Sequence, residues 1–156
     1  MATKPFFVPR KEIQLFDTFN EELIDDILGQ YVDIYKVSLK ETDVNIYGEA
    51  ADGILTFDKG FRVNCLVQFE TPDVDMTEFG ADLNASIGLY FHRNSLKDSN
   101  FYPEIGDIVD YNDFYFEINS ATEPQLIAGN PDYKHDIIAT AHRRRLSSVN
   151  FSERIR

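Results

Sequence analysis

Three histidines, one cysteine and 27 carboxylates are the side chains of this chain whose types suit catalysis or metal binding. The histidines are His92, His135 and His142, and none of them belongs to a zinc-binding motif such as H-E-x-x-H. Each falls near the end of a different predicted strand. A zinc site assembled from them in space is the less favoured interpretation, because single histidines more often form hydrogen bonds in turns or interfaces. We therefore expect no bound metal.

The remaining reactive groups give equally little support for catalysis. Cys65 lies on the apolar face of an alternating segment, which predicts a buried structural thiol rather than a nucleophile. Asp73 with Asp75, and Asp110 with Asp113, have spacings that suit a hard cation or an acid–base pair, but so acidic a chain forms such pairs by chance. The sequence has no nucleophile elbow, Walker loop or G-x-G-x-x-G motif. It predicts neither an enzyme nor a cofactor.

Composition places the chain among single-domain globular proteins. It has 156 residues, of which 43% are hydrophobic, and a net charge of −12. This acidity argues against a surface that grips nucleic acid, which needs a basic footprint. One cysteine excludes an intramolecular disulfide framework, and no apolar run approaches the roughly 20 residues that span a bilayer. The first ten residues lack the apolar stretch of a signal peptide, so we expect a soluble protein kept in a reducing cytoplasm.

The charge divides the chain into an acidic body and a basic tail. Residues 1–142 carry 10 basic and 26 acidic side chains, whereas residues 143–156 carry five arginines and one glutamate. Two interpretations of the tail stay open. It is either a solvated extension or a segment that docks on an acidic partner, with apolar anchors at Leu146, Val149, Phe151 and Ile155.

One helix is expected near the N-terminus, after an irregular arm over residues 1–15. Thr18 to Glu21 fits a capping box, in which the hydroxyl and the carboxylate each satisfy a free backbone N–H. Apolar residues then recur at helical spacing as far as Leu28, and Gly29 is a suitable C-cap. The pattern predicts one amphipathic helix over residues 18–28.

Alternating apolar residues predict strands along the rest of the chain. Asn112-Asp113 is a favourable two-residue hairpin turn between two of them. Without helical patterns between the strands, the sequence predicts a single antiparallel sheet, closed as a barrel or packed as a sandwich, over residues 16–142. The expected strands cover residues 31–39, 61–69, 83–91, 107–111, 114–118 and 136–141.

Aromatic residues are abundant, with 13 Phe and 8 Tyr. Most of them are expected in the core, but some fall where burial is not assured. In an oligomer such residues anchor interfaces. The aromatic residues concerned are Phe6, Phe7, Tyr47, Phe101, Tyr102 and Tyr133.

A series of short segments occurs in an order that resembles one known family. The segments are FNEELI (19–24), NIYGEA (45–50), FYPEIGDIV (101–109), FEI (116–118), GNPDYKH (129–135) and ATAHR (139–143). Their order resembles the neck, or head-closure (head-completion), proteins of contractile-tailed bacteriophages of the T-even type. The resemblance covers most of residues 16–145. The chain lacks the long C-terminal extension of the T-even neck protein, so the roles of that extension do not carry over.

The resemblance implies a structural, non-enzymatic virion protein that is assembled in the host cytoplasm. Such proteins form a ring below the portal and its adaptor, close the DNA-filled head and receive the tail. The implied partners are copies of the same chain, the adaptor ring above, and the tail terminator or the sheath and tube proteins below. A hexamer is favoured over a dodecamer because the ring must meet a sixfold tail. Genomic DNA would pass through the ring without sequence-specific binding.

Particular residues can be given roles on this hypothesis. Turns are expected at Gly48, Pro103, Gly106, Gly129 and Pro131. The arginine cluster at 143–145 would pair with acidic neighbours. The candidate subunit or partner contacts are Phe6, Phe7, Tyr47, Glu49, Tyr133, His135, Arg143, Arg144, Arg145, Phe151, Arg154 and Arg156.

The main alternative is another phage ring component, namely a head–tail adaptor, a tail terminator or a baseplate protein. A β-barrel that binds nucleic acid is less favoured, because its groove should be lined with Lys and Arg. In this chain only the tail is basic.

Overall fold

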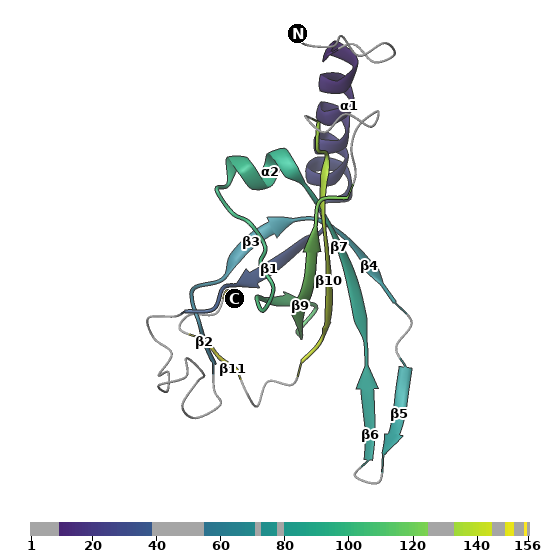
Figure 1. Cartoon of the computed structure of the whole chain (residues 1–156), viewed down its shortest axis with the longest axis vertical. Coiled ribbons are helices and arrows are strands. Elements are labelled where there is room, and N and C mark those ends of the chain that lie inside the picture. The colour runs from purple at the N-terminus through teal and green to yellow at the C-terminus, as the bar shows by residue number, and fades with distance from the viewer. Residues whose placement is uncertain are drawn as a thin grey trace.

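The computed structural model describes residues 10–38, 55–70, 73–77, 80–124, 133–144, 149–151 and 155, with only the backbone at 73–77, 80–83 and 149–150. Figure 1 shows a β-barrel with a helix standing at one end and a β-hairpin extending from the other. The elements are α1 (Arg10–Glu22), the π-helical η1 (Leu23–Leu28), β1 (Tyr31–Tyr35), β2 (Leu55–Phe57), β3 (Phe61–Asn64), β4 (Leu66–Phe69), β5 (Asp73–Thr77), β6 (Gly80–Asn84), β7 (Ser86–His92), α2 (Arg93–Asp98), β8 (Ile108–Tyr111), β9 (Phe114–Thr122), β10 (Asp136–Arg143) and β11 (Val149–Phe151).

The main sheet has seven strands in the order β3-β1-β8-β9-β10-β7-β4, and every neighbouring pair is antiparallel. Its two edge strands, β3 and β4, are separated in the chain by Cys65 alone. One bent segment thus pairs with β1 through its first half and with β7 through its second half, which closes the sheet into a barrel. The expected mainly β class, with a single antiparallel sheet and an N-terminal helix, is confirmed.

Gln30 holds the bend between β3 and β4. Its backbone oxygen accepts a hydrogen bond from the N–H of Cys65 at 3.0 Å, and its side-chain oxygen accepts one from the N–H of Val67 at 3.1 Å. Val63 and Cys65 are buried as the alternation predicts, whereas Phe61 and Phe69, at the two ends, are exposed. Val63 and Cys65 belong to the main core cluster and Val67 packs against it, whereas Phe61 and Phe69 lie outside that cluster.

The core is formed by alternate side chains of the strands, as the period of two requires. Ile87, Leu89 and Phe91 of β7 lie in one cluster with Phe116 and Ile118 of β9. The hairpin between β8 and β9 turns at Asn112 and Asp113, whose φ angles are 52° and 65°. Two consecutive positive φ angles define the type I′ turn that matches the twist of a hairpin, so the predicted turn is confirmed.

The helix starts earlier than predicted. Arg10 is its first residue, and Thr18 lies inside it, where its hydroxyl donates a hydrogen bond to the carbonyl oxygen of Gln14 at 2.9 Å. The predicted capping box is therefore wrong, and residues 10–15 of the expected irregular arm are helical. Gly29 caps the other end with a φ of 56°, as predicted. Among the described residues, no helix has the length and apolar character needed to cross a membrane.

Several short elements were not predicted, namely the strands β2 and β5, the helix α2 and the strand β11. The helix α2 has six residues, too few to show a helical period, although its Leu96 is buried in the main core. The strand β11 lies in the basic tail and pairs in parallel with β2. Arg143, the first residue of the predicted tail, still belongs to β10. The described parts of the tail thus pack on the body of the same chain.

Cys65 is a buried thiol, as predicted, and it offers a chemical probe of barrel opening. Burial raises the pKa of this thiol to about 12. At pH 8 the thiolate fraction falls about a thousandfold below that of a free cysteine, before steric protection is added. We expect negligible reaction of the folded chain with a colorimetric disulfide reagent over an hour and complete reaction in guanidinium. Reaction within minutes in native buffer would contradict the closed barrel.

Candidate functional site

The helix formed by α1 and η1 exposes a group of large apolar side chains. We call Leu15, Phe16, Phe19, Ile27 and Leu28 the helix surface; all five are exposed. Leu15 is 70% exposed and Phe19 is 60% exposed, and they lie one turn apart on the same side of α1. In α1 only Ile13 is buried. Because burial of each such side chain is worth about 1.5–3 kcal/mol, covering this surface would be strongly favourable.

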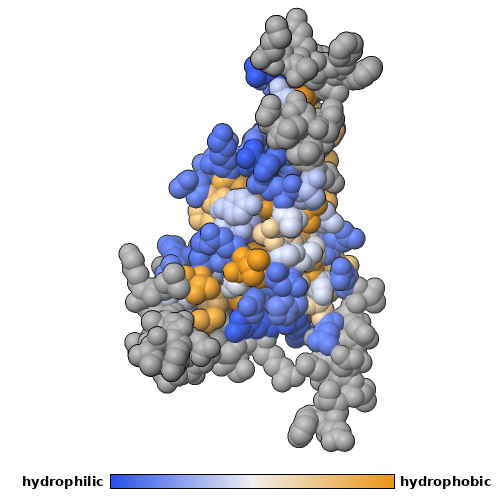
Figure 2. Space-filling view, in the orientation of Figure 1, coloured by the Kyte–Doolittle hydropathy of each residue, from blue (hydrophilic) through white to orange (hydrophobic). Residues whose placement is uncertain are grey.

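The barrel also exposes aromatic residues, and each of them has a neighbour in the chain, as does Phe16 of the helix surface, whose ring centre lies 5.1 Å from that of His135. The rings of Phe61 and Phe101 stack at 4.9 Å, and the guanidinium of Arg62 lies 4.4 Å from the ring centre of Tyr31. Figure 2 shows apolar residues exposed between polar ones on this face of the barrel. The barrel surface is therefore mixed, whereas α1 and η1 together expose five large apolar side chains.

Many of the predicted site residues lie outside the described residues. These are the contact candidates Phe6, Phe7, Tyr47, Glu49, Arg145, Arg154 and Arg156, and the turn candidates Gly48, Gly129 and Pro131.

The other contact candidates have partners within their own chain. Tyr133 accepts a hydrogen bond from Nε of Arg10 at 3.1 Å. Arg144 forms an ion pair with Glu117, and Arg143 lies over the ring of Phe114 at 4.8 Å. These contacts hold the N-terminal helix and the start of the tail against the barrel.

The turn before β8 is built around a buried carboxylate. Gly106 has a φ of 95°, which glycine adopts without strain, and Pro103 is buried beside it in the turn. One carboxylate oxygen of Asp107 accepts a hydrogen bond from the N–H of Glu104 at 2.9 Å. Burial raises the pKa of Asp107, while that N–H and the ammonium of Lys36 oppose the increase. The Pro103–Asp107 segment thus closes on itself and positions β8.

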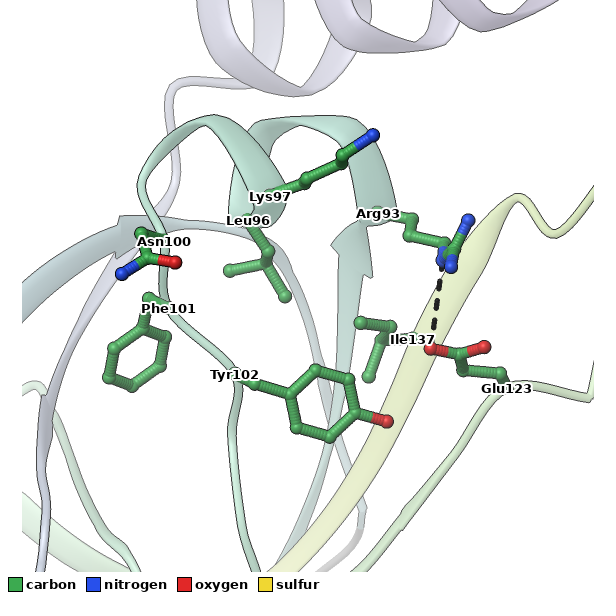
Figure 3. Close-up of a pocket in the computed structure, with 8 residues that line it drawn as sticks. All are labelled: Arg93, Leu96, Lys97, Asn100, Phe101, Tyr102, Glu123 and Ile137. Atoms are coloured by element: carbon green, nitrogen blue, oxygen red, sulfur yellow. Dashed lines mark ion pairs between the residues drawn. The ribbon is translucent and has the colours of Figure 1, made fainter.

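A pocket of ≈ 250 Å³ lies between α2, the following loop and β10 (Figure 3). Leu96, Tyr102 and Ile137 supply apolar surface, and charged residues surround it. Glu123 pairs with Arg93 at 3.7 Å and with Lys134, and the Lys134 hydrogen bond is the main reason that its pKa is lowered. The lining residues contain no cysteine, serine or histidine.

Two of the three histidines meet below α1. His92 ends β7, His135 precedes β10, and these strands are antiparallel, with Asp136 opposite His92. Asp17 of α1 completes the group, and one potential ligand atom from each of Asp17, His92 and His135 lies within 4.8 Å of the others. The sequence predicts the three histidines near the ends of three different strands and does not indicate which of these ends are adjacent. His135, a predicted contact residue, is buried in this cluster.

No family model matches the chain, and no curated protein matches it. A chain of a solved structure described as the virion of a native gene transfer agent (GTA) particle is similar to it. The two are 12% identical, with a TM-score of 0.47, and the match covers 76% of this chain and 96% of that chain. Similarity at this level does not establish a shared function.

Proposed function

We propose that this chain is a structural protein of a bacteriophage virion. Within the virion we assign it to the neck ring that closes the DNA-filled head and receives the tail. The assembly role rests on the exposed helix surface. The position at the neck rests on the ordered sequence segments that resemble T-even neck proteins.

An assembly subunit needs an apolar surface that is stabilised when a neighbour covers it, and the exposed side chains of the helix surface are of this kind. In a cyclic ring each subunit contacts the next head to tail, so a projecting apolar element of one subunit fits a different surface of its neighbour. The helix α1 and the β5–β6 hairpin extend from opposite ends of the barrel (Figure 1). Both are well placed to reach adjacent subunits or the rings above and below.

The closed barrel and the acidic charge of the chain are compatible with a ring through which DNA passes. A closed sheet has no free edge for uncontrolled pairing with other chains. The acidic body, with a net of −16 over residues 1–142, repels phosphates, so DNA can move past it without being held. The function that follows is mechanical, without a catalytic step or a cofactor.

The position in the particle is the decisive test. Particles would be purified from the culture that makes this protein, the chain identified in them by mass spectrometry, and the head–tail junction imaged by cryo-electron microscopy with symmetry averaging. We expect the barrel and its projecting helix to fit a sixfold ring between the portal–adaptor and the tail. Fitting instead into the adaptor, the tail terminator or the baseplate would overturn the neck assignment. Absence of the chain from particles would overturn the virion role.

A further inference from the structure

The Asp17–His92–His135 cluster has the composition and geometry of a metal site. We propose that these three side chains bind a Zn²⁺ ion that ties the helix α1 to the barrel. His92 is 1% exposed and His135 is 8% exposed, and each lies at the end of a strand that belongs to the barrel. Asp17 is half-buried and comes from the projecting helix. The proposal is independent of the neck assignment.

His92 has a buried nitrogen available for a ligand bond. Its Nε2 has no hydrogen-bond partner among the described residues, which is unfavourable for a buried polar atom. Its Nδ1 lies 3.4 Å from Oγ of Ser95, and that hydroxyl donates to Oδ2 of Asp25 at 3.3 Å. This arrangement places the ring proton on Nδ1 and leaves the lone pair on Nε2. A metal-binding histidine is commonly oriented in this way through its second nitrogen.

His135 shows the same pattern with a carboxylate on each side. Its Nδ1 lies 3.1 Å from Oδ1 of Asp17, and its Nε2 lies 3.3 Å from Oδ1 of Asp136. With the metal on the Asp17 side, Nε2–H donates to Asp136. The side-chain amide of Asn20 also lies 3.0 Å from Nε2 and can turn its oxygen toward that N–H.

Two imidazoles and one carboxylate favour zinc over calcium or magnesium, which prefer oxygen ligands throughout. Tetrahedral zinc with bonds of about 2.0–2.1 Å places its ligand atoms about 3.3 Å apart. Nδ1 of His135 and Oδ1 of Asp17 lie 3.1 Å apart, close to this separation. One ligand atom from each of the three side chains lies within 4.8 Å of the others, so the set closes further when it holds an ion. Three protein ligands leave the fourth position to water.

A proton is the competing occupant of this cluster. A charged His135 would pair with both Asp17 and Asp136, but it would leave Nε2 of His92 without a partner. The two occupants predict different behaviour. Zinc stabilises the chain in proportion to its concentration, whereas a proton stabilises it only as the pH falls.

The test uses the full chain without a histidine tag, treated with a chelator and then titrated with Co²⁺. We expect one equivalent to produce the visible absorption of a tetrahedral site and Zn²⁺ to bleach it. At a hundred times its dissociation constant, Zn²⁺ should raise the melting temperature by about 5–10 °C. His92→Gln and Asp17→Asn should each weaken Co²⁺ binding at least tenfold. Asp17→Asn lies on the half-exposed helix, so it tests the site even if His92→Gln impairs folding.

His142→Gln is the matched control. This third histidine is 50% exposed on β10 and lies outside the cluster, so its variant should bind Co²⁺ like the wild type. The proposal is overturned if the wild type shows no cobalt absorption, if both cluster variants keep it, or if the control loses it. A melting temperature that rises toward pH 5.5 without any response to Zn²⁺ would assign the cluster to a proton instead.

Discussion

The double variant Leu15→Ser/Phe19→Ser is expected to remain folded and to lose the self-association that the proposed ring role requires of the wild-type chain. Both side chains are already exposed in the single chain, at 70% and 60%, so their removal takes little from the core. In an interface, truncation of a central apolar anchor typically costs 2 kcal/mol or more. Two such losses would weaken association about a thousandfold. Light scattering coupled to gel filtration measures the change in mass, and circular dichroism verifies the fold.

Ile105→Ser is the matched control for this experiment. Ile105 is 71% exposed, as much as Leu15, but it lies in the turn before β8 and not on the helix. If assembly depends on the helix surface, the Ile105 variant should keep the wild-type mass. If the two variants lose the oligomer equally, exposed apolar area in general drives association. If the double variant still assembles, the helix surface is not the interface.

The barrel was largely predictable because its strands are specified by local alternation. β7, β9 and β10 show a period of two over many residues, and Asn112-Asp113 adopts the positive φ angles that its residue types tolerate. The closure of the barrel was not specified locally. It depends on one segment that pairs with β1 and β7 in turn, with Gln30 holding the bend. No pattern within the segment shows which strands lie beside it.

The start of the helix was missed because a favourable local motif competed with a longer helix. Thr18 and Glu21 suit a capping box, but the residues before them continue the helix, and Thr18 instead bonds to Gln14. Short elements were missed for a related reason, since six residues in α2 and three in β11 show no period.

The histidine cluster depends on strand register and on the helix together. When the strands predicted at residues 83–91 and 136–141 are paired antiparallel, His92 lies next to His135. Nothing in the sequence indicates that Asp17, more than 70 residues from either, joins them. Clusters of this kind need the packing of α1 against the ends of β7 and β10, which only the tertiary structure defines.

Phe151→Ala is expected to destabilise the chain substantially, although it alters the basic tail. The ring of Phe151 lies 4.6 Å from that of Tyr35, 5.3 Å from that of Tyr115 and 5.9 Å from that of Phe57. Tyr35 and Phe57 are fully buried, so truncation opens a cavity beside them. A fully buried Phe costs about 3–5 kcal/mol on truncation, and for this half-buried ring we expect about 2–3 kcal/mol. The melting temperature should fall by about 5–10 °C.

Phe114→Ala provides the comparison for that loss. Phe114 is exposed at the start of β9, and its ring lies under the guanidinium of Arg143, so its truncation removes a surface contact without opening the core. We expect less than about 1 kcal/mol from this change. Guanidinium unfolding followed by fluorescence or circular dichroism measures both variants. A clear excess for Phe151 would mean that β11 is part of the folded domain, because a solvated tail has no stability to lose. If both variants lose equally little stability, the tail is a solvated extension that can bind an acidic partner.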